Sequence, residues 1–252
     1  MATILWPLTR ILGLIATAPL FGNMSVPVRI KIGLGILLSL IITPTISSLP
    51  DADPISLAGL LILTQQLIIG LAMGFAMRVV FATVEMAGEV AGLTMGFGFA
   101  TFFDPQTRGR SSAISQFLAL LMLMLFLATN THLMLLSALA ESFVTLPIST
   151  APIGVRGMKQ IADWGQLIFS AGLQLSLPIV AALLVTNIAL GILTRAAPQL
   201  NLFGIGFPIT LGVGFIIIAL ALPYLATPLE RLFGEGLEIT RQIATPAMTG
   251  PR

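Results

Sequence analysis

Residues Trp164 to Thr194 read WGQLIFSAGLQLSLPIVAALLVTNIALGILT and carry no charged side chain over 31 positions. An uncharged apolar run of roughly 18 residues or more is typical of a transmembrane helix. As one helix this run would be about 46 Å long at about 1.5 Å per residue, whereas a hydrocarbon core is about 30 Å thick. We expect the segment either to break near Pro178 or to extend beyond the lipid. Apolar helices that leave the bilayer need another apolar surface, which predicts a subunit of a protein assembly.

The composition of the whole chain agrees with this interpretation. Of 252 residues, 56% are hydrophobic and only 9% are Asp, Glu, Lys or Arg, against about 25% charged residues in an ordinary soluble domain. This excludes a soluble enzyme and a disordered tail, and the scattered charges of the net +2 chain argue against nucleic-acid binding. The absence of Cys and the single histidine, His132, predict no metal site and no cofactor.

The charged residues divide the chain into about six apolar helical segments, because charges are costly inside a bilayer. We expect an all-α, polytopic membrane protein whose segments form long hairpins, with one irregular Gly/Phe loop. The segments are Ile4 to Phe21, Ile32 to Leu49, Ile55 to Met77, Ser111 to Ala140, Trp164 to Thr194 and Leu202 to Ala226, and a more amphipathic stretch runs from Arg78 to Met95.

A polar helix face is predicted at Arg78, Glu85 and Glu89, whose spacings of seven and four place them on one side of a helix. Such a face cannot point at lipid. Two carboxylates near an arginine could form an ion or proton pathway. The alternative is a polar face that packs on a neighbouring helix or lies at the membrane interface, and we consider this packing role the more common one.

The stretch from Gly92 to Pro105 reads GLTMGFGFATFFDP and is the most unusual in the chain. Three glycines within seven residues disfavour a helix, and Asp104-Pro105 ends one. The phenylalanines make it too apolar for a solvated loop, and irregular backbone at membrane depth must be buried in protein or line a cavity. We expect either a movable plug in a conduit or a re-entrant packing loop. The candidate residues are Gly96, Phe97, Gly98, Phe99, Ala100, Thr101, Phe102, Phe103 and Asp104.

A hairpin turn is predicted between the last two apolar segments, where helix-ending and polar residues interrupt them. Its residues are Arg195, Pro198, Gln199 and Asn201. His132 follows Asn130, and we expect it at a helix end beside a short break rather than as a proton carrier. No Ser-His-Asp arrangement, metal-ligand spacing or acid/base pair supports catalysis, so we expect no enzymatic activity.

Several motifs, in order along nearly the whole chain, resemble the FliR family of flagellar biosynthesis proteins. Virulence-secretion counterparts of that family are the T subunits of type III export gates. The motifs are TRILGL from Thr9, APLFG from Ala18, VPVRIKIGLG from Val26, FATFFDP from Phe99, RAAPQLN from Arg195 and IGFP from Ile205.

The resemblance implies a subunit of the export gate through which unfolded flagellar proteins cross the bacterial inner membrane at the flagellar basal body. It implies FliP and FliQ as pore-forming partners, FlhB and FlhA as attached export proteins, and contact with membrane lipid. In the family, residues 1–160 of this single domain (1–252) would correspond to a P-like part, and residues 164–245 to a Q-like helical hairpin. The plug loop of the family corresponds to residues 96–104.

A stand-alone small-solute or ion transporter that uses Arg78, Glu85 and Glu89 remains the alternative function. It predicts transport by this chain alone or as a homo-oligomer. The sequence has no obvious internal repeat of the kind that many secondary transporters show, which speaks against this alternative.

Overall fold

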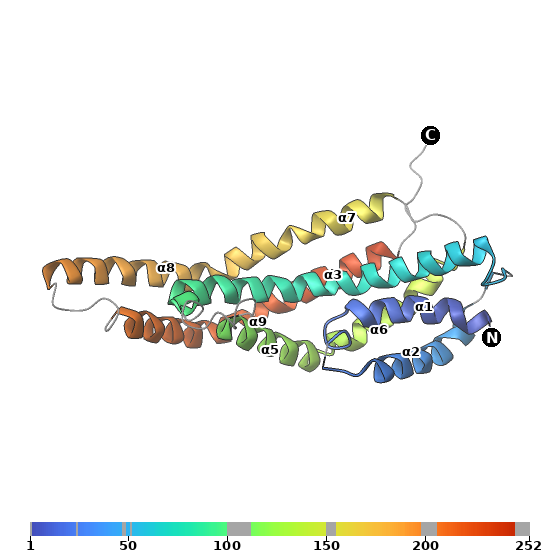
Figure 1. The fold of residues 1–252 in the computed structure, drawn as a ribbon, viewed down its shortest axis with the longest axis horizontal. Helices are drawn as coiled ribbons and strands as arrows, with labels where there is room; N and C mark the ends of the chain where they lie inside the picture. Colours follow the sequence, from blue (N-terminus) through green and yellow to red (C-terminus); the bar gives the residue numbers. More distant parts are fainter. Residues whose placement is uncertain are drawn as a thin grey trace. The chain divides into compact units, whose positions relative to one another are not determined.

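The computed structural model describes residues 2–23, 25–46, 49–50, 52–99, 112–149, 155–197 and 206–244. Within these ranges the chain forms helices and no strand, which confirms the expected all-α class (Figure 1). The α-helices are α1 (Ala2–Thr17), α2 (Val28–Ile42), α3 (Leu57–Met95), α5 (Ala113–Ala128), α6 (Thr131–Thr145), α7 (Val155–Gly165), α8 (Leu167–Ala196) and α9 (Phe207–Ile243). Two short 3₁₀ helices are η1 (Thr43–Thr45) and η2 (Phe97–Phe99).

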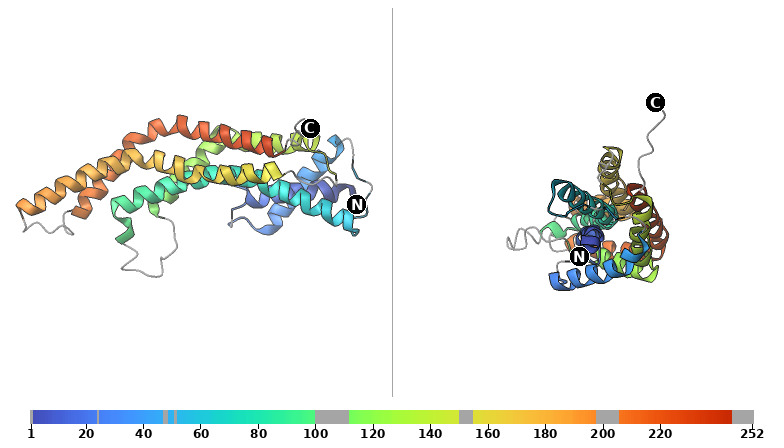
Figure 2. Two further views of the ribbon diagram at one scale, coloured as in Figure 1. Left: turned by 90° about the horizontal axis from the view of Figure 1, so that it is seen from above. Right: turned by 90° about the vertical axis from the view of Figure 1, so that its right-hand side faces the viewer.

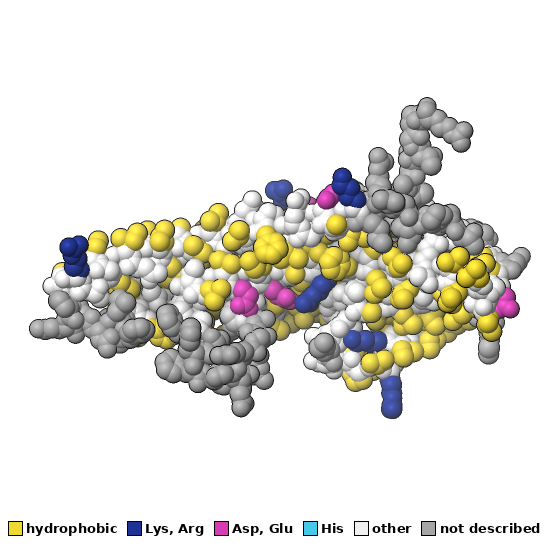
Figure 3. Space-filling view, turned by 45° about the horizontal axis from the view of Figure 1, so that its top comes forward, with side chains coloured by type: hydrophobic (Ala, Val, Ile, Leu, Met, Phe, Trp, Pro, Cys, Tyr) yellow, Lys and Arg dark blue, Asp and Glu magenta, His cyan; other side chains and the backbone are white. Residues whose placement is uncertain are grey.

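The described part of the chain contains four helices that are long and apolar enough to cross a membrane, or up to five if α5 and α6 together form one broken span. The chain is therefore a polytopic membrane protein. Hydrophobic side chains are spread along the whole of the described surface seen in Figure 3, and charged side chains are few and scattered on it.

One of the predicted segment boundaries is wrong. The third segment and the amphipathic stretch after it form one continuous helix, α3, of 39 residues. Arg78 does not interrupt this helix, because its side chain is exposed and leaves the backbone hydrogen bonds intact. The fourth segment is divided into α5 and α6, in agreement with the short break expected beside His132, because Asn130 adopts a left-handed conformation with φ 56°.

The chain packs as two compact units, each assembled from segments that are far apart in the sequence. Unit 1 comprises residues 1–80, 126–166 and 231–252, and unit 2 comprises residues 81–125 and 167–230. Helices α3 and α9 each contribute residues to both units. These units do not correspond to the expected P-like part (residues 1–160) and Q-like hairpin (residues 164–245). That division describes resemblance to other subunits, not packing, and it stays a prediction.

Unit 1 is built on a very close contact between α1 and α3. A Cβ atom on Gly70 would lie 2.0 Å from the carbonyl oxygen of Arg10, and one on Gly74 would lie 2.7 Å from that of Leu14. Small residues allow membrane helices to approach in this way and to gain van der Waals contact where lipid provides no hydrophobic driving force. Trp6 and Met73 lie in the same core and are almost completely buried.

Arg10, the single charge within the first apolar segment, is completely buried in unit 1. Its Nε donates to Oε1 of Gln66 at 2.8 Å, and its Nη1 donates to the carbonyl oxygen and the Oγ of Ser142 at 2.8 and 3.0 Å. Its Nη2 donates to the carbonyl oxygen of Leu146 at 2.9 Å, and the guanidinium lies 4.4 Å from the ring centroid of Phe143. Arg10 thereby connects α1 with α3 and satisfies carbonyl groups at the C-terminal end of α6.

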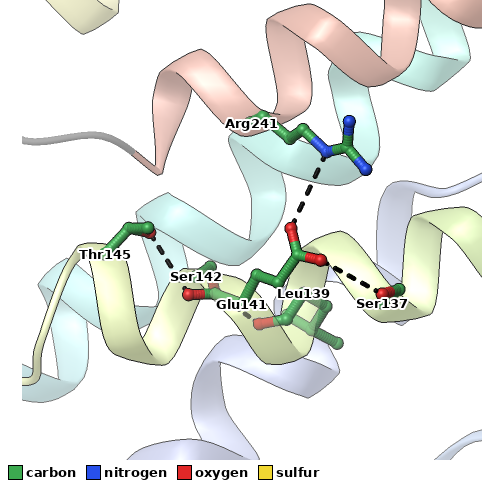
Figure 4. Close-up of polar contacts among 6 residues, drawn as sticks. All are labelled: Ser137, Leu139, Glu141, Ser142, Thr145 and Arg241. Atoms are coloured by element: carbon green, nitrogen blue, oxygen red, sulfur yellow. Dashed lines mark hydrogen bonds and ion pairs between the residues drawn. The ribbon is translucent and has the colours of Figure 1, made fainter.

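The surface of unit 1 carries a weaker polar cluster on α6 (Figure 4). Arg241 Nε lies 3.8 Å from a carboxylate oxygen of Glu141, and Ser137 Oγ donates to the other oxygen at 3.3 Å. Both charged side chains are about half exposed. Ion pairs of this kind contribute little to stability.

In unit 2 the C-terminal part of α3 packs with α5, α8 and the part of α9 up to residue 230. The views in Figures 1 and 2 show α8 and this part of α9 alongside each other. A Cβ atom on Gly172 of α8 would lie 3.0 Å from Cγ of Met86 and 3.1 Å from the carbonyl oxygen of Thr83. The helices of unit 2 therefore also meet at small residues.

Candidate functional site

The predicted irregular loop begins at Gly96, directly after the last residue of α3. Gly96 has φ 98°, a backbone conformation that is costly for residues with a Cβ atom, and its N–H donates to the carbonyl oxygen of Leu93 at 3.1 Å. The α-helix therefore ends four residues later than the predicted start of the irregular stretch at Gly92, and Phe97–Phe99 form the 3₁₀ helix η2. Gly92 has a packing role instead, since a Cβ atom there would lie 2.7 Å from Oγ of Ser112.

The last residue of α3 and the beginning of the loop contact α9. Oγ1 of Thr210 donates to the carbonyl oxygen of Met95 at 3.4 Å, and a Cβ atom on Gly214 would lie 2.6 Å from the side chain of Met95. The ring of Phe97 lies edge-on to that of Phe215, with centroids 6.4 Å apart and an interplanar angle of 89°. We call these contacts the N-terminal anchor of the loop.

A second set of contacts holds the residue at which the described chain resumes. The backbone N–H of Ser112 donates to Oε1 of Glu89 at 2.7 Å, and Ser112 Oγ accepts the backbone N–H of Ser115 at 3.1 Å. Ser112 is therefore the N-cap of α5, and the Glu89 carboxylate satisfies the free N–H of that cap residue. A carboxylate is also favourable beside a helix N-terminus on account of the helix dipole.

The same two helices are in backbone contact around this cap. Ser115 Oγ donates to the carbonyl oxygen of Glu85 at 2.9 Å, and Ser112 Oγ donates to that of Gly88 at 3.3 Å. A Cβ atom on Gly88 would lie 2.4 Å from Cα of Ser115. We call Glu85, Gly88, Glu89, Ser112 and Ser115 the C-terminal anchor of the loop.

The residues of the predicted polar face on α3 therefore have different environments. Glu85 and Glu89 are half-buried in unit 2, while Arg78 is exposed on the part of α3 that belongs to unit 1. Glu89 caps a neighbouring helix, as the packing alternative predicts. Conduction of ions along this face stays an untested prediction.

Of the nine predicted loop residues, Gly96, Phe97, Gly98 and Phe99 are described, and residues 100–104 lie outside the described ranges. Phe97 and Gly98 are half-buried. A Cβ atom on Gly98 would lie 3.2 Å from the side chain of Leu93, so the residue is close to α3.

The predicted hairpin turn is described only at its beginning. Arg195 is exposed in the last turn of α8, and α8 ends at Ala196, before Pro198, as expected for a helix that precedes a proline. The positive charge at this position is favourable at a helix C-terminus. Pro198, Gln199 and Asn201 lie outside the described residues.

His132 lies in the first turn of α6 directly after the break at Asn130, which agrees with the expected helix-end position. Its ring centroid lies 6.2 Å from that of Phe126, and within the described residues its Nδ1 has no hydrogen-bond partner. The described ranges contain no group of three His, Cys, Asp or Glu residues that could hold a metal ion.

Two features of the structure were missed by the sequence analysis. One is the buried hydrogen-bond cluster of Arg10, for which a single charge inside an apolar segment is a usable signal. The other is an apolar cavity in unit 2, which depends on how four helix segments pack and leaves no sequence signal beyond Pro178.

The fold and the site define a class of protein, namely an all-helical integral membrane protein in which the two anchors lie on either side of residues 100–111 and the described residues contain no cluster that could hold a metal ion. Residues 1–236 match the family described as "Bacterial export proteins, family 1". The chain belongs to this family, and within it to the flagellar FliR proteins.

Three relatives illustrate how closely the chain follows the family. The flagellar biosynthetic protein FliR of Pectobacterium carotovorum is 45% identical over 241 residues, which cover 95% of this chain and 92% of the relative. FliR of Escherichia coli K12 is 44% identical over 91% of this chain and 88% of its own length. FliR of Bacillus subtilis is 31% identical over 93% of this chain and 91% of its own length.

Proposed function

We propose that this chain is a non-enzymatic subunit of the flagellar protein export gate and that residues 96–104 form a plug in its pore. In this proposal, FliP and FliQ complete the pore in the inner membrane, FlhB and FlhA attach to it, and unfolded flagellar proteins pass through it. Membership of the export-protein family supports the general role, and the two anchors around the Gly/Phe segment support the plug.

The observation that carries the plug is the fixation of both ends of residues 100–111. On one side, Met95 and Phe97 contact α9. On the other side, Glu89 and Gly88 of α3 hold Ser112 at the start of α5. Contacts on both flanks keep the segment tethered to α9 on one side and to α3 on the other, which a plug that stays with its gate requires.

The chemistry of the segment suits a seal. Gly96 provides the positive φ at which α3 ends, and the phenylalanine side chains that follow are large and apolar. A passing polypeptide would displace them, and the anchors would restore the closed state. The driving force would come from partner proteins, so this chain needs no cofactor and no catalytic group.

The long apolar helices support an assembly with other subunits. Helices α8 and α9 contain 30 and 37 residues, or about 45 and 55 Å at about 1.5 Å per residue, which exceeds a hydrocarbon core of about 30 Å. Only 17% of the most apolar window in α9 is buried within the chain. Related subunits would cover these faces, with residues 1–160 taking the P-like place and residues 164–245 the Q-like place.

The test of the plug is a deletion of Gly98 to Phe102 in the full chain, expressed in a flagellated host. We expect the gate to assemble and the inner membrane to become permeable to small ions, because the apolar seal is removed. A deletion of equal length at residues 150–154, between α6 and α7, is the matched control and should leave the membrane tight. A tight membrane after the 98–102 deletion, with normal assembly, would refute the plug.

A further inference from the structure

One side of helix α8 in unit 2 is left open by the described part of the chain. The buried side of the helix is formed by Gly172, Ser176, Ile179, Leu183 and Leu190. Only 17% of the most apolar window of the span 159–196 is buried within the chain. The open side carries large aliphatic side chains that are between 58% and 68% exposed, namely Leu177, Leu184, Val185, Ile188 and Ile192.

Two amide side chains lie among these aliphatic groups. Gln174 and Asn187 are both exposed, and neither forms a hydrogen bond with a residue that the structure describes. An α-helix turns by about 100° per residue. Gln174 therefore lies on the side opposite to the buried residues, and Asn187 lies on the flank of the buried side.

Hydrocarbon is a poor neighbour for this surface. A membrane core of about 30 Å corresponds to about 20 residues of a helix. Every window of that length within the charge-free stretch 164–194 contains Gln174, Asn187 or both. An amide without a hydrogen bond is unfavourable in an apolar medium. Lipid would therefore leave at least one amide unsatisfied, at whatever depth the helix lies.

Water is a poor neighbour for the same surface. It would satisfy the amides, but it would leave the aliphatic side chains of Leu184 and Ile188 beside Asn187 hydrated, which is unfavourable. A protein surface that is aliphatic and carries an amide or hydroxyl group at the matching position suits both parts. Contacts of this composition are common between membrane helices, where polar side chains form hydrogen bonds across the interface.

Gly191 provides a place for close approach beside Asn187. The two residues are four positions apart and therefore lie on one side of α8. Gly191 is exposed, and a Cβ atom on it would meet nothing within 4 Å. Glycine is unfavourable in a helix, and no contact with a described residue requires it at this position. A small residue next to a polar one is the combination at which membrane helices approach closely and form hydrogen bonds.

We propose that the open side of α8 packs against an apolar helix of a partner subunit, which approaches at Gly191 and places an amide or hydroxyl side chain within hydrogen-bond distance of Asn187. A second contact of the same kind satisfies Gln174, about 20 Å away along α8. The inference rests on the proposed function, which supplies the partner subunits. It adds the chemistry of their contact, namely Asn, Gln, Ser or Thr within an otherwise apolar partner helix.

The first test compares Asn187→Leu with Ile188→Leu in the full chain, expressed with its native partners in its own host. Asn187→Leu removes the amide, whereas Ile188→Leu changes the adjacent exposed position without loss of a polar group. The tagged chain is purified at increasing detergent concentration, and the retained partner subunits are quantified. We expect Asn187→Leu to weaken the association by roughly 3- to 20-fold, as for the loss of one hydrogen bond between membrane helices, and Ile188→Leu to leave it unchanged.

The outcomes of this comparison separate the inference from the proposed function. Equal retention of partner subunits by both variants and the parent chain overturns the inference and leaves the proposed function intact. A parent chain that retains no partner subunit overturns both.

The thermal unfolding midpoint of the isolated chain in detergent shows whether the amide acts within the chain. Because Asn187 has no hydrogen bond to a described residue, Asn187→Leu should leave this midpoint unchanged. Gly191→Leu should leave it unchanged or raise it slightly, while it reduces the retained partner subunits by blocking close approach. Midpoints that fall together with the retention of partners would assign these residues to the folding of this chain and would overturn the inference.

Photo-crosslinking identifies the neighbour directly. A benzophenone side chain is introduced at position 188 of the chain in its native complex, and the crosslinked product is analysed by mass spectrometry. We expect a crosslink to an apolar peptide of a partner subunit that contains Asn, Gln, Ser or Thr within one helical turn of the crosslinked residue. A crosslink to a phospholipid, or to a peptide without such a residue, overturns the inference.

A thiol probe tests for water at the same position. The chain has no cysteine, so Asn187→Cys carries a single thiol. We expect this thiol in the native complex to resist a water-soluble maleimide and to react after denaturation. Rapid reaction in the native complex would show that the position faces water and would overturn the inference.

Discussion

Removal of the Glu89 carboxylate should release the start of α5. Its oxygen accepts the N–H of Ser112 at 2.7 Å and lies at a helix N-terminus. A hydrogen bond to a charged group contributes about 1.5–3 kcal/mol, and the interaction with the helix dipole adds about 0.3–1 kcal/mol. Because Glu89 is half-buried, solvent screening reduces this sum, and we expect Glu89→Ala to cost about 1–2 kcal/mol locally.

The assay is hydrogen–deuterium exchange of the full chain at the amides of residues 112–116. A local loss of about 1–2 kcal/mol corresponds to a roughly 5- to 30-fold faster exchange of these amides if they open locally. Glu89→Gln keeps an acceptor oxygen but loses the charge, so its exchange should increase less than that of Glu89→Ala.

The control is Glu141→Ala, which removes a half-exposed carboxylate from the weak pair with Arg241. It should leave exchange at residues 112–116 unchanged. Unchanged exchange at these amides in Glu89→Ala would refute the role of Glu89 in the C-terminal anchor. If Glu89→Gln instead abolished ion flux through the isolated chain, the transporter alternative would gain support.

Two further substitutions test the packing of unit 1. Arg10→Met removes the donor to acceptors on Gln66, Ser142 and Leu146, and each buried acceptor left without a partner costs about 1–3 kcal/mol. The substitution should therefore lower the thermal unfolding midpoint in detergent, whereas Arg195→Met at an exposed position should not. Equal midpoints for the two variants would contradict the hydrogen bonds of Arg10. Gly70→Ala would place a Cβ atom 2.0 Å from a backbone oxygen and should reduce the yield of folded protein. Gly191→Ala, which meets nothing within 4 Å, should be neutral or slightly stabilising, and a normal yield for Gly70→Ala would refute the close contact of α1 and α3.

The class of the fold can be predicted from the sequence because charged side chains are costly in lipid, so every membrane-spanning segment has to be apolar. The sequence also predicts that helix is lost somewhere within Gly92–Pro105, and the structure shows a local reason for the end of α3 before Gly96, namely the positive φ that glycine readily adopts. It fails at Arg78, because an exposed arginine on a helix surface does not end a helix. Whether a charged residue can lie within a helical segment depends on the residues around it in the folded structure.

The C-terminal anchor and the Arg10 cluster are harder to predict from the sequence. Glu89 and Ser112 are 23 positions apart, and Arg10 and Ser142 are 132 positions apart, so neither pair lies within a helical repeat. Their hydrogen bonds arise only once the glycines at 88 and 70 bring the helices together. The apolar cavity likewise results from three-dimensional packing around Pro178.

The central claim, that this chain is one subunit of a mixed export gate, is tested most directly by native mass spectrometry of the tagged protein extracted gently from its own host. The proposal predicts one copy of this chain bound to several copies of two smaller hydrophobic proteins. In such a complex, the neighbouring subunits would cover the exposed faces of α8 and α9. Recovery of this chain alone, or as a symmetric homo-oligomer, would contradict the proposal.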